Sequence, residues 1–140
     1  MIRPAAAVVD TNVLVAGLLS FRAASPVARV LDGMLSAAFP YVLSRELLRE
    51  YGSVLARPGL QKRHGLTPAE IEILLTDLAQ NAIVLGPVAG PPAPEPGDQL
   101  LWNLLAAKPD LLLVTGDKLL LEDESMRGRV LTPKAFLAKA

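Results

Sequence analysis

The sequence predicts an α/β fold, a single three-layer α/β/α domain with a mostly parallel central sheet. Short apolar runs typical of buried strands, at residues 5–9, 39–43, 82–85 and 111–115, alternate with stretches of helical periodicity. Serine or threonine followed by proline recurs where helices are expected to start, as at Thr67 and Pro68. The chain lacks hairpin signals between these runs, so right-handed βαβ crossovers are expected to connect the strands.

The first elements follow from local patterns. Residues 5–9 are apolar without alternation, as in a parallel strand covered on both faces. Helical periodicity follows over residues 11–20, and a serine-proline pair opens a helix over residues 26–37. After the strand at 39–43, Ser44 caps a helix with an apolar stripe at helical spacing.

Proline and glycine punctuate the rest of the chain. The run 57–59 ends the third helix, and a capping box at 67–70 opens a helix that ends near Asn81. Residues 86–97 contain five of the 12 prolines and are expected to be a surface loop, so residues 1–140 are expected to form one domain. The remaining elements are expected to be a helix at 98–108, a strand at 111–115, a short helix after Asp117, a strand at 129–131 and a terminal helix capped by Thr132.

Composition excludes several classes of protein. The chain has no cysteine, which rules out disulfides and thiolate metal sites. It shows no signal peptide and no run of the ~20 apolar residues that span a bilayer, so a cytoplasmic protein without a membrane partner is expected. The 14 basic and 14 acidic residues give a net charge of +0, so any nucleic-acid binding requires basic residues gathered beside an acidic centre.

Acidic residues recur at corresponding points of the predicted fold. Asp10 and Asp117 follow apolar strands, Asp98 begins a helix, and Glu46 lies in the first turn of another helix. Strand C-termini and the following helix N-termini share one edge of a parallel sheet, where α/β folds place ligands. Glu50 is one helical turn further on and is expected to lie away from this edge.

Four converging carboxylates without histidine or cysteine form an oxygen-only site, which suits Mg²⁺ or Mn²⁺. Such a site is typical of hydrolytic phosphoryl transfer, in which a metal activates water. Each acid alone is equally consistent with a helix cap or a favourable charge at a helix N-terminus. Their joint placement at one edge favours the catalytic interpretation.

The chain resembles a PIN domain over most of its length. The similar segments are DTNVL at 10–14, SRELL at 44–48, Asp98, VTGD at 114–117 and LTPKAFL at 131–137. The last segment is similar to the branch of VapC-like toxins from toxin–antitoxin pairs. That branch commonly shows an aspartate where Glu95 stands and often an acid where Leu119 stands.

The resemblance implies a metal-dependent endoribonuclease with an RNA substrate, a cognate antitoxin protein and a homodimeric state. It implies that Mg²⁺ or Mn²⁺ is held by four catalytic carboxylates, which are Asp10, Glu46, Asp98 and Asp117. Asn12 and Thr115 would orient these ligands. Possible substrate contacts near the same edge are Arg22, Arg45, Arg49 and Lys118. The alternative is that they are ordinary surface charges that only keep the protein soluble.

Three further side chains are interpreted structurally. His64, beside Lys62 and Arg63, is expected in a solvated loop. Trp102 and Tyr51 lie on helical patterns and are expected to be core or interface residues.

A signalling module of receiver type is the competing class, because it is also a small parallel α/β protein with acids at strand ends. It requires an adjacent acidic pair after the first strand, where this chain has Asp10 alone, and a lysine on the last strand, where Lys118 instead follows Asp117. A PIN-like scaffold without activity is a second alternative. The presence of all four acids argues against it.

Overall fold

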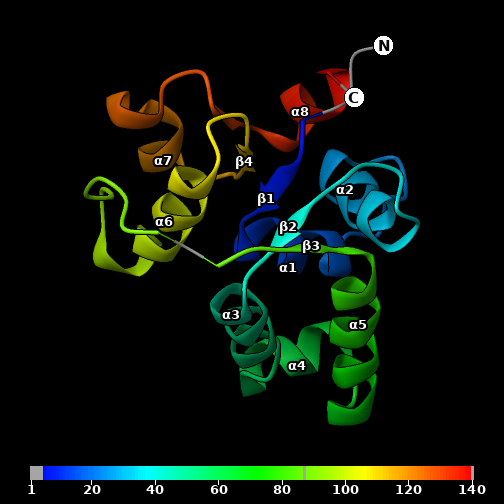
Figure 1. Ribbon diagram of the computed structural model, residues 1–140. Coiled ribbons are helices and arrows are strands. Elements are labelled where there is room, and N and C mark those ends of the chain that lie inside the picture. The colour runs from blue at the N-terminus through cyan, green and yellow to red at the C-terminus, as the bar shows by residue number, and fades with distance from the viewer. Residues whose placement is uncertain (1–4, 87, 140) are drawn as a thin grey trace.

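The structure is a computed structural model that describes residues 5–86 and 88–139. Its five strands, β1 (Ala7–Val9), β2 (Val42–Leu43), β3 (Ile83–Val84), β4 (Leu112–Val114) and β5 (Val130–Leu131), are all parallel. β1, β4 and β5 form a three-stranded sheet in that order, and β2 and β3 form a two-stranded sheet. A parallel bridge between Ala7 and Tyr41 joins the two sheets. The predicted α/β class with a parallel sheet is confirmed (Figure 1).

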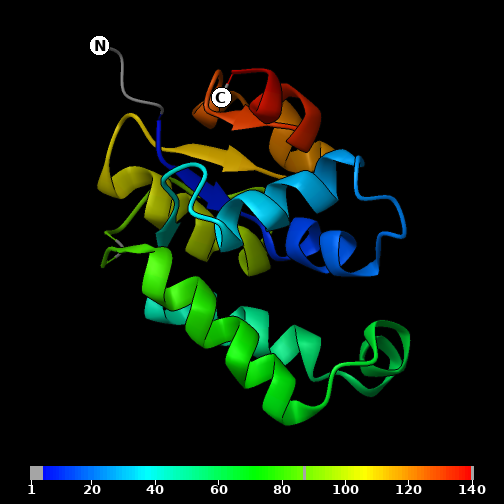
Figure 2. The same ribbon diagram turned by 90° about the vertical axis from the view of Figure 1, so that its right-hand side faces the viewer.

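Helices cover the sheet on both sides. Their bounds are α1 (Thr11–Leu19), α2 (Pro26–Leu35), α3 (Arg45–Leu55), α4 (Pro58–His64), α5 (Pro68–Asn81), α6 (Gln99–Ala107), α7 (Lys118–Glu122) and α8 (Pro133–Lys139), with short 3₁₀ turns at Pro96–Asp98 and Glu124–Met126. α6 and α2 lie on opposite sides of β1, while α3, α4 and α5 extend together below the sheet (Figures 1 and 2). None of the helices in the described ranges combines the length and apolarity needed to cross a membrane.

The helix starts follow the expected capping chemistry. The Ser25 hydroxyl accepts from the amide of Ala28 at 3.2 Å, and Ser44 accepts from Leu47 at 3.1 Å. At α5, Thr67 accepts from the amide of Glu70 while the Glu70 carboxylate accepts from the amide of Thr67, which completes the predicted capping box. These bonds satisfy amides that have no partner inside the helix.

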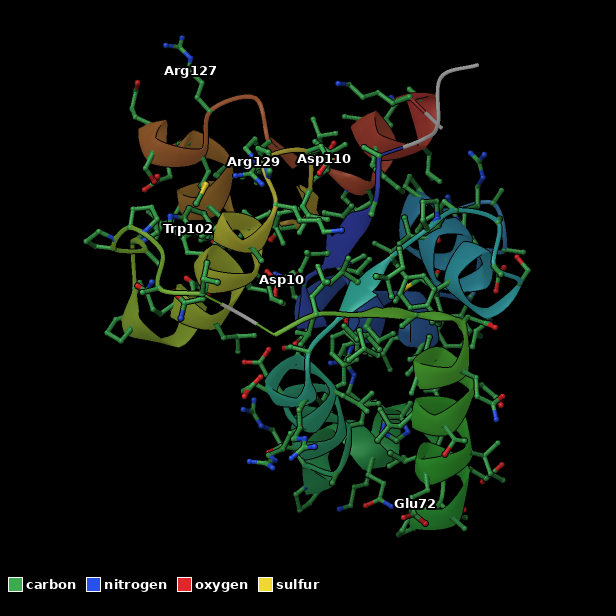
Figure 3. The ribbon with its side chains drawn as sticks, in the orientation of Figure 1. Asp10, Glu72, Trp102, Asp110, Arg127 and Arg129 are labelled. Carbon is green, nitrogen blue, oxygen red and sulfur yellow. The ribbon has the colours of Figure 1, made fainter. Side chains whose placement is uncertain are left out.

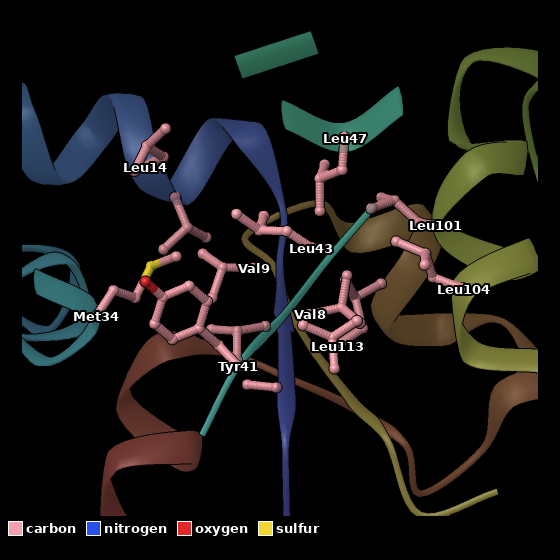
Figure 4. Close-up of a cluster of buried hydrophobic side chains, with 14 of the residues drawn as sticks. Val8, Val9, Leu14, Met34, Tyr41, Leu43, Leu47, Leu101, Leu104 and Leu113 are labelled. Carbon is pink, nitrogen blue, oxygen red and sulfur yellow. The ribbon is translucent and has the colours of Figure 1, made fainter. Parts of the chain in front are cut away.

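The core lies on both sides of β1. The close-up in Figure 4 shows Val8 and Val9 between side chains from β2, β4 and the covering helices, including Tyr41, Leu104 and Leu113. Tyr41 donates its hydroxyl to the carbonyl of Leu78 at 2.6 Å, so its polar atom is satisfied inside the core.

Two tertiary hydrogen bonds fix further aromatic residues. Tyr51 donates to the carbonyl of Val9, and Trp102 donates its indole N–H to Ser125 at 3.1 Å. Both rings are fully buried, which confirms the expectation that Tyr51 and Trp102 are core residues. The Tyr51 bond has a functional consequence, since it ties the middle of α3 to the end of β1.

The segment after α3 differs from the expectation of a solvated loop. Pro58 ends the third helix as predicted but also starts α4, because proline is favoured at the first position of a helix. His64 closes α4, with Nε2 2.8 Å from the carbonyl oxygen of Leu55 and Nδ1 accepting from the amide of Leu66 at 2.9 Å. The expectation that Lys62, Arg63 and His64 lie in a loop is therefore wrong.

The proline-rich segment packs onto α6, as far as it is described. The amide of Gly90 donates to the Asn103 side chain at 3.0 Å, and that of Ala93 donates to Gln99 at 2.9 Å. The Gln99 amide group in turn donates to the carbonyl of Pro91 at 3.0 Å. The segment is a surface loop, and its end brings Asp98 to the start of α6.

Candidate active site

Asp10 occupies the turn between β1 and α1, at the carboxyl edge of the sheet. Its side chain is only 8% exposed. Its amide donates to the carbonyl of Val114 at 2.9 Å, which joins it to the end of β4. The buried hydroxyl of Thr115 donates to Asp10 Oδ2 at 2.7 Å. Two residues at the end of β4 thus hold Asp10, and Thr115 lies 105 residues later in the sequence.

Thr115 also positions the next acid. Its hydroxyl accepts from the amide of Asp117 at 3.0 Å. The Asp117 carboxylate accepts from the amide of Leu119 at 2.9 Å and caps α7. One threonine at the end of β4 therefore fixes both Asp10 and the backbone of Asp117, in accord with the orienting position implied for Thr115.

Glu50 lies beside Asp10, contrary to the sequence-based expectation. The hydroxyl of Thr11 donates to the Glu50 carboxylate. Glu50 is also one of the charges that raise the pKa of Asp10 and of Asp98. The expectation that Glu50 is too far along its helix is wrong, because the second turn of α3 is the one tied to β1 through Tyr51.

Glu46 is the glutamate of α3 that the sequence analysis placed in the site instead of Glu50. It is exposed on the first turn of α3. Among the described residues, the carboxylates that raise the pKa of Asp10 are Asp98 and Glu50, and Glu46 is not one of them. Glu46 is thus not among the charges that act on Asp10, and its place among the metal ligands stays a prediction. Helical phase could not separate the two glutamates, since residues four apart share one helix face.

Asp98 connects the remaining acids. It ends the 3₁₀ turn before α6 and is partly buried. Its pKa is raised by burial and then by the charges of Asp117, Glu95 and Glu50. We call Asp10, Glu50, Asp98 and Asp117 the carboxylate cluster. Glu95, noted as a departure in the sequence, contributes one more negative charge beside it.

The electrostatics of Asp10 are those of a carboxylate without a counter-charge. Burial, followed by the charges of Asp98 and Glu50, raises its pKa from 3.8 to about 6. The hydrogen bond from Thr115 opposes this increase but does not cancel it. A cation placed in the cluster would favour the ionised form of each member.

The chemistry of the donor set fits a hard divalent cation. All four members of the carboxylate cluster offer oxygen, the ligand that Mg²⁺ and Mn²⁺ prefer. Within the described ranges, no three acidic or histidine side chains already stand in position to hold one ion. Metal binding therefore requires side-chain movement, which the partial exposure of Glu50, Asp98 and Asp117 permits.

A groove of about 450 Å³ opens beside Asp10. Its polar end is formed by Asp10, Thr11, Asn12 and Glu50. Asn12 is exposed there, so its amide is available to a ligand, whereas its implied contact with the carboxylates is not observed among the hydrogen bonds of the described residues. In Figure 3, Asp10 lies between α6 and α3, near the middle of the molecule.

The basic residues considered as substrate contacts are all exposed. Arg22 lies between α1 and α2, Arg45 and Arg49 lie on α3, and Lys118 begins α7 directly after Asp117. None of these four forms an ion pair within the part of the chain that the structure describes. Their charges are available to a polyanion.

Comparison with known proteins agrees with this geometry. A family model described as PIN domain matches residues 6–119, which include the whole carboxylate cluster. No curated protein matches the chain. PIN domains are generally nucleases, and they typically use divalent metals. The match covers most of the sequence, and the chain belongs to the PIN-domain family.

Proposed function

We propose that this protein is a divalent-metal-dependent endoribonuclease whose active site is the carboxylate cluster. The observation that carries the proposal is the buried Asp10, whose pKa is raised to about 6 by burial and by neighbouring carboxylates. Burying a carboxylate beside other carboxylates costs free energy. Carboxylates whose pKa is raised in this way are concentrated at functional sites. In this proposal Glu50 replaces Glu46 among the metal ligands.

Mg²⁺ or Mn²⁺, when bound by Asp10, Glu50, Asp98 and Asp117, supplies positive charge that activates water and stabilises the leaving oxygen. Three of these carboxylates accept hydrogen bonds in the metal-free protein. Thr115 holds Asp10, Thr11 holds Glu50, and the amide of Leu119 holds Asp117.

The reaction is a hydrolysis of an RNA phosphodiester. A water oxygen forms a bond to phosphorus while the bond from phosphorus to the leaving oxygen breaks. One proton of the water ends on the leaving oxygen, and no covalent enzyme intermediate forms. The exposed amide of Asn12 borders the groove, and in this proposal it donates to a phosphate oxygen of the substrate. Arg22, Arg45, Arg49 and Lys118 supply the positive charge that a polyanion requires around a negative centre.

The test measures cleavage of single-stranded RNA by purified protein with Mg²⁺, with Mn²⁺ and with EDTA. Asp10→Asn is expected to reduce the rate by more than ~100-fold, since loss of even an outer-shell partner of a metal costs 10–100-fold. Asp110→Asn is the matched control, because Asp110 is an exposed aspartate just before β4. We expect it to cleave like the wild type.

Undiminished cleavage by Asp10→Asn would eliminate the assignment. Phosphorylation of the protein by a small phosphodonor would support the receiver-type alternative instead. Correct folding of both variants is checked by circular dichroism and thermal unfolding, so that loss of cleavage is not confused with loss of structure.

We further propose that the protein is the toxin of a toxin–antitoxin pair and forms a homodimer. The negative charge of the carboxylate cluster fits a basic side chain inserted by an antitoxin, which would take the place of the metal charge. A small protein from the neighbouring reading frame should co-purify with this chain and suppress its cleavage of RNA. Harmless overexpression of an active nuclease that no neighbour restrains would indicate a housekeeping enzyme.

A further inference from the structure

Two hydrogen bonds join α3 to the turn between β1 and α1. The hydroxyl of Tyr51 donates to the carbonyl of Val9, the residue before Asp10. The hydroxyl of Thr11, the residue after Asp10, donates to the carboxylate of Glu50. The residues on both sides of Asp10 are thus bonded to two adjacent residues of α3.

The carbonyl of Val9 accepts a side-chain donor at the point where β1 and β2 separate. Within the described ranges these two strands share a single bridge, between Ala7 and Tyr41. β2 then pairs with β3, and the carbonyl of Val9, two residues past the bridge, accepts from Tyr51 of α3. A buried carbonyl without a partner costs free energy, so this bond favours the position of α3 against the end of β1.

The Tyr51 hydroxyl lies near the acids but does not face the groove. Its side chain is fully buried, and the described residues that line the groove do not include it. Burial raises the pKa of Tyr51, and the charges of Asp10 and Glu50 raise it further. The neutral hydroxyl has one hydrogen to donate, and the carbonyl of Val9 accepts it. Any effect of Tyr51 on the site therefore passes through the backbone of α3 and β1.

We propose that the Tyr51 hydroxyl is a positioning group of the metal site, which together with Thr11 holds Glu50 at the height of Asp10. The carboxylates then reach a metal by side-chain rotation, while α3 keeps its place on the sheet. Groups that orient metal ligands without contacting the metal contribute to affinity and activity. This inference rests on the proposed function, because it concerns the same carboxylate cluster.

Tyr41 offers a matched comparison, since it is the other of the chain's two tyrosines. It is also buried, and its hydroxyl donates to the carbonyl of Leu78 at 2.6 Å. Figure 4 shows it among the side chains of the core. Burial raises its pKa to about 12, and within the described residues neither Asp10 nor Glu50 contributes to this increase. Tyr41→Phe therefore removes an equivalent bond away from the carboxylate cluster.

The test measures Mn²⁺ affinity by calorimetry, without RNA, for wild type, Tyr51→Phe and Tyr41→Phe. Each substitution deletes one hydroxyl and leaves one carbonyl without its donor, so both should lower the urea midpoint of unfolding by similar amounts. Tyr51→Phe should in addition bind Mn²⁺ about 10-fold more weakly, the lower end of the range for residues that orient metal ligands. Tyr41→Phe should bind Mn²⁺ like the wild type.

The dependence of cleavage on metal concentration gives a second readout. At low Mn²⁺, Tyr51→Phe should cleave RNA about 10-fold more slowly than the wild type. Saturating Mn²⁺ should restore most of the rate, because all four carboxylates are still present. The KM for RNA should not change, since the hydroxyl does not reach the groove.

Thr11→Val and Thr11→Ser test the same tie independently of Tyr51. Valine has nearly the shape of threonine but no hydroxyl, so Thr11→Val should weaken Mn²⁺ binding by removing the donor to Glu50. Thr11→Ser keeps the hydroxyl and should bind Mn²⁺ like the wild type.

Wild-type Mn²⁺ affinity in Tyr51→Phe and in Thr11→Val would overturn the inference. An equal loss of affinity in Tyr41→Phe would also overturn it, because the tyrosine hydroxyls would then support the fold rather than the site. A wild type that binds Mn²⁺ more tightly than Tyr51→Phe but cleaves no RNA would contradict the proposed function alone. A wild type that binds no Mn²⁺ would contradict both.

Discussion

Arg129 and Asp10 are charged side chains at opposite edges of one parallel sheet, and their surroundings differ in kind (Figure 3). Arg129 precedes β5, and its guanidinium donates to the carbonyl oxygens of Leu105, Lys108 and Leu111 at 2.7, 2.6 and 3.1 Å. These carbonyls end α6 and lead into β4, where backbone acceptors lack helical partners. The guanidinium of Arg129 therefore links the end of α6 to the start of β4 at the amino edge of the sheet.

Asp10 has no comparable compensation. Its donors are the hydroxyl of Thr115 and the backbone N–H of Thr11, while the charges of Asp98 and Glu50 oppose its ionisation. Charge that is satisfied inside the fold indicates a structural role, and charge that is left unsatisfied indicates a site awaiting a ligand. The contrast predicts that substitutions at the two edges separate stability from activity.

The sharpest test compares two glutamates of α3. Glu50→Gln is expected to reduce cleavage by more than ~100-fold, because it removes a ligand rather than an outer-shell partner. Glu46→Gln should change the rate by less than about twofold, since Glu46 is an exposed residue one turn away. Initial rates with Mg²⁺, together with metal titration by calorimetry, measure both. A loss confined to Glu46→Gln would restore the sequence-based assignment.

At the amino edge the expected effect is on stability. Arg129→Met should lower the free energy of unfolding by about 2–3 kcal/mol, since it leaves three carbonyls without their shared donor. Urea denaturation measures this change. The cleavage rate per folded molecule should stay that of the wild type.

Arg127→Met is the matched control for this prediction. Arg127 is an exposed arginine two positions away, and its ion pair with Glu124 at 3.8 Å is open to solvent. Such pairs contribute little to stability, so the unfolding transition should not move. A large destabilisation by Arg127→Met, or none by Arg129→Met, would contradict the structural role given to the amino edge.

The last expected effect is a pH dependence of the stability of the metal-free protein. The pKa of Asp10 is raised from 3.8 to about 6 on folding, so between these values the folded protein holds a proton that the unfolded chain has lost. Stability contributed by this proton is fully present below pH 4, decreases as the pH rises to about 6, and is then constant. Two pKa units correspond to at most ~3 kcal/mol.

The measurement compares wild type with Asp10→Asn in EDTA. Urea unfolding at pH 4 and at pH 7 should show the wild type losing more stability over this interval than the variant, which has no carboxyl at this position. At pH 7 the variant should be the more stable of the two. Parallel pH profiles for the two proteins would show that Asp10 is not destabilised by its surroundings.

The elements that the sequence predicted correctly depend on local physics. Apolar runs identified the strands, and Ser25, Ser44 and Thr67 marked helix starts through short-range hydrogen bonds. The positions of Asp10 and Asp117 at strand ends followed from the same patterns, because parallel topology brings all strand C-termini to one edge. α4 was missed, since its proline is equally consistent with the end of α3 and with the start of another helix.

What the sequence determined by itself is therefore the parallel α/β arrangement, the helix starts marked by Ser25, Ser44 and Thr67, and the aspartates at the carboxyl edge. Only the tertiary structure decided between Glu46 and Glu50, because these residues share one helix face and differ only in height along α3. The bond from Tyr51 to Val9 sets that height by tying α3 to β1.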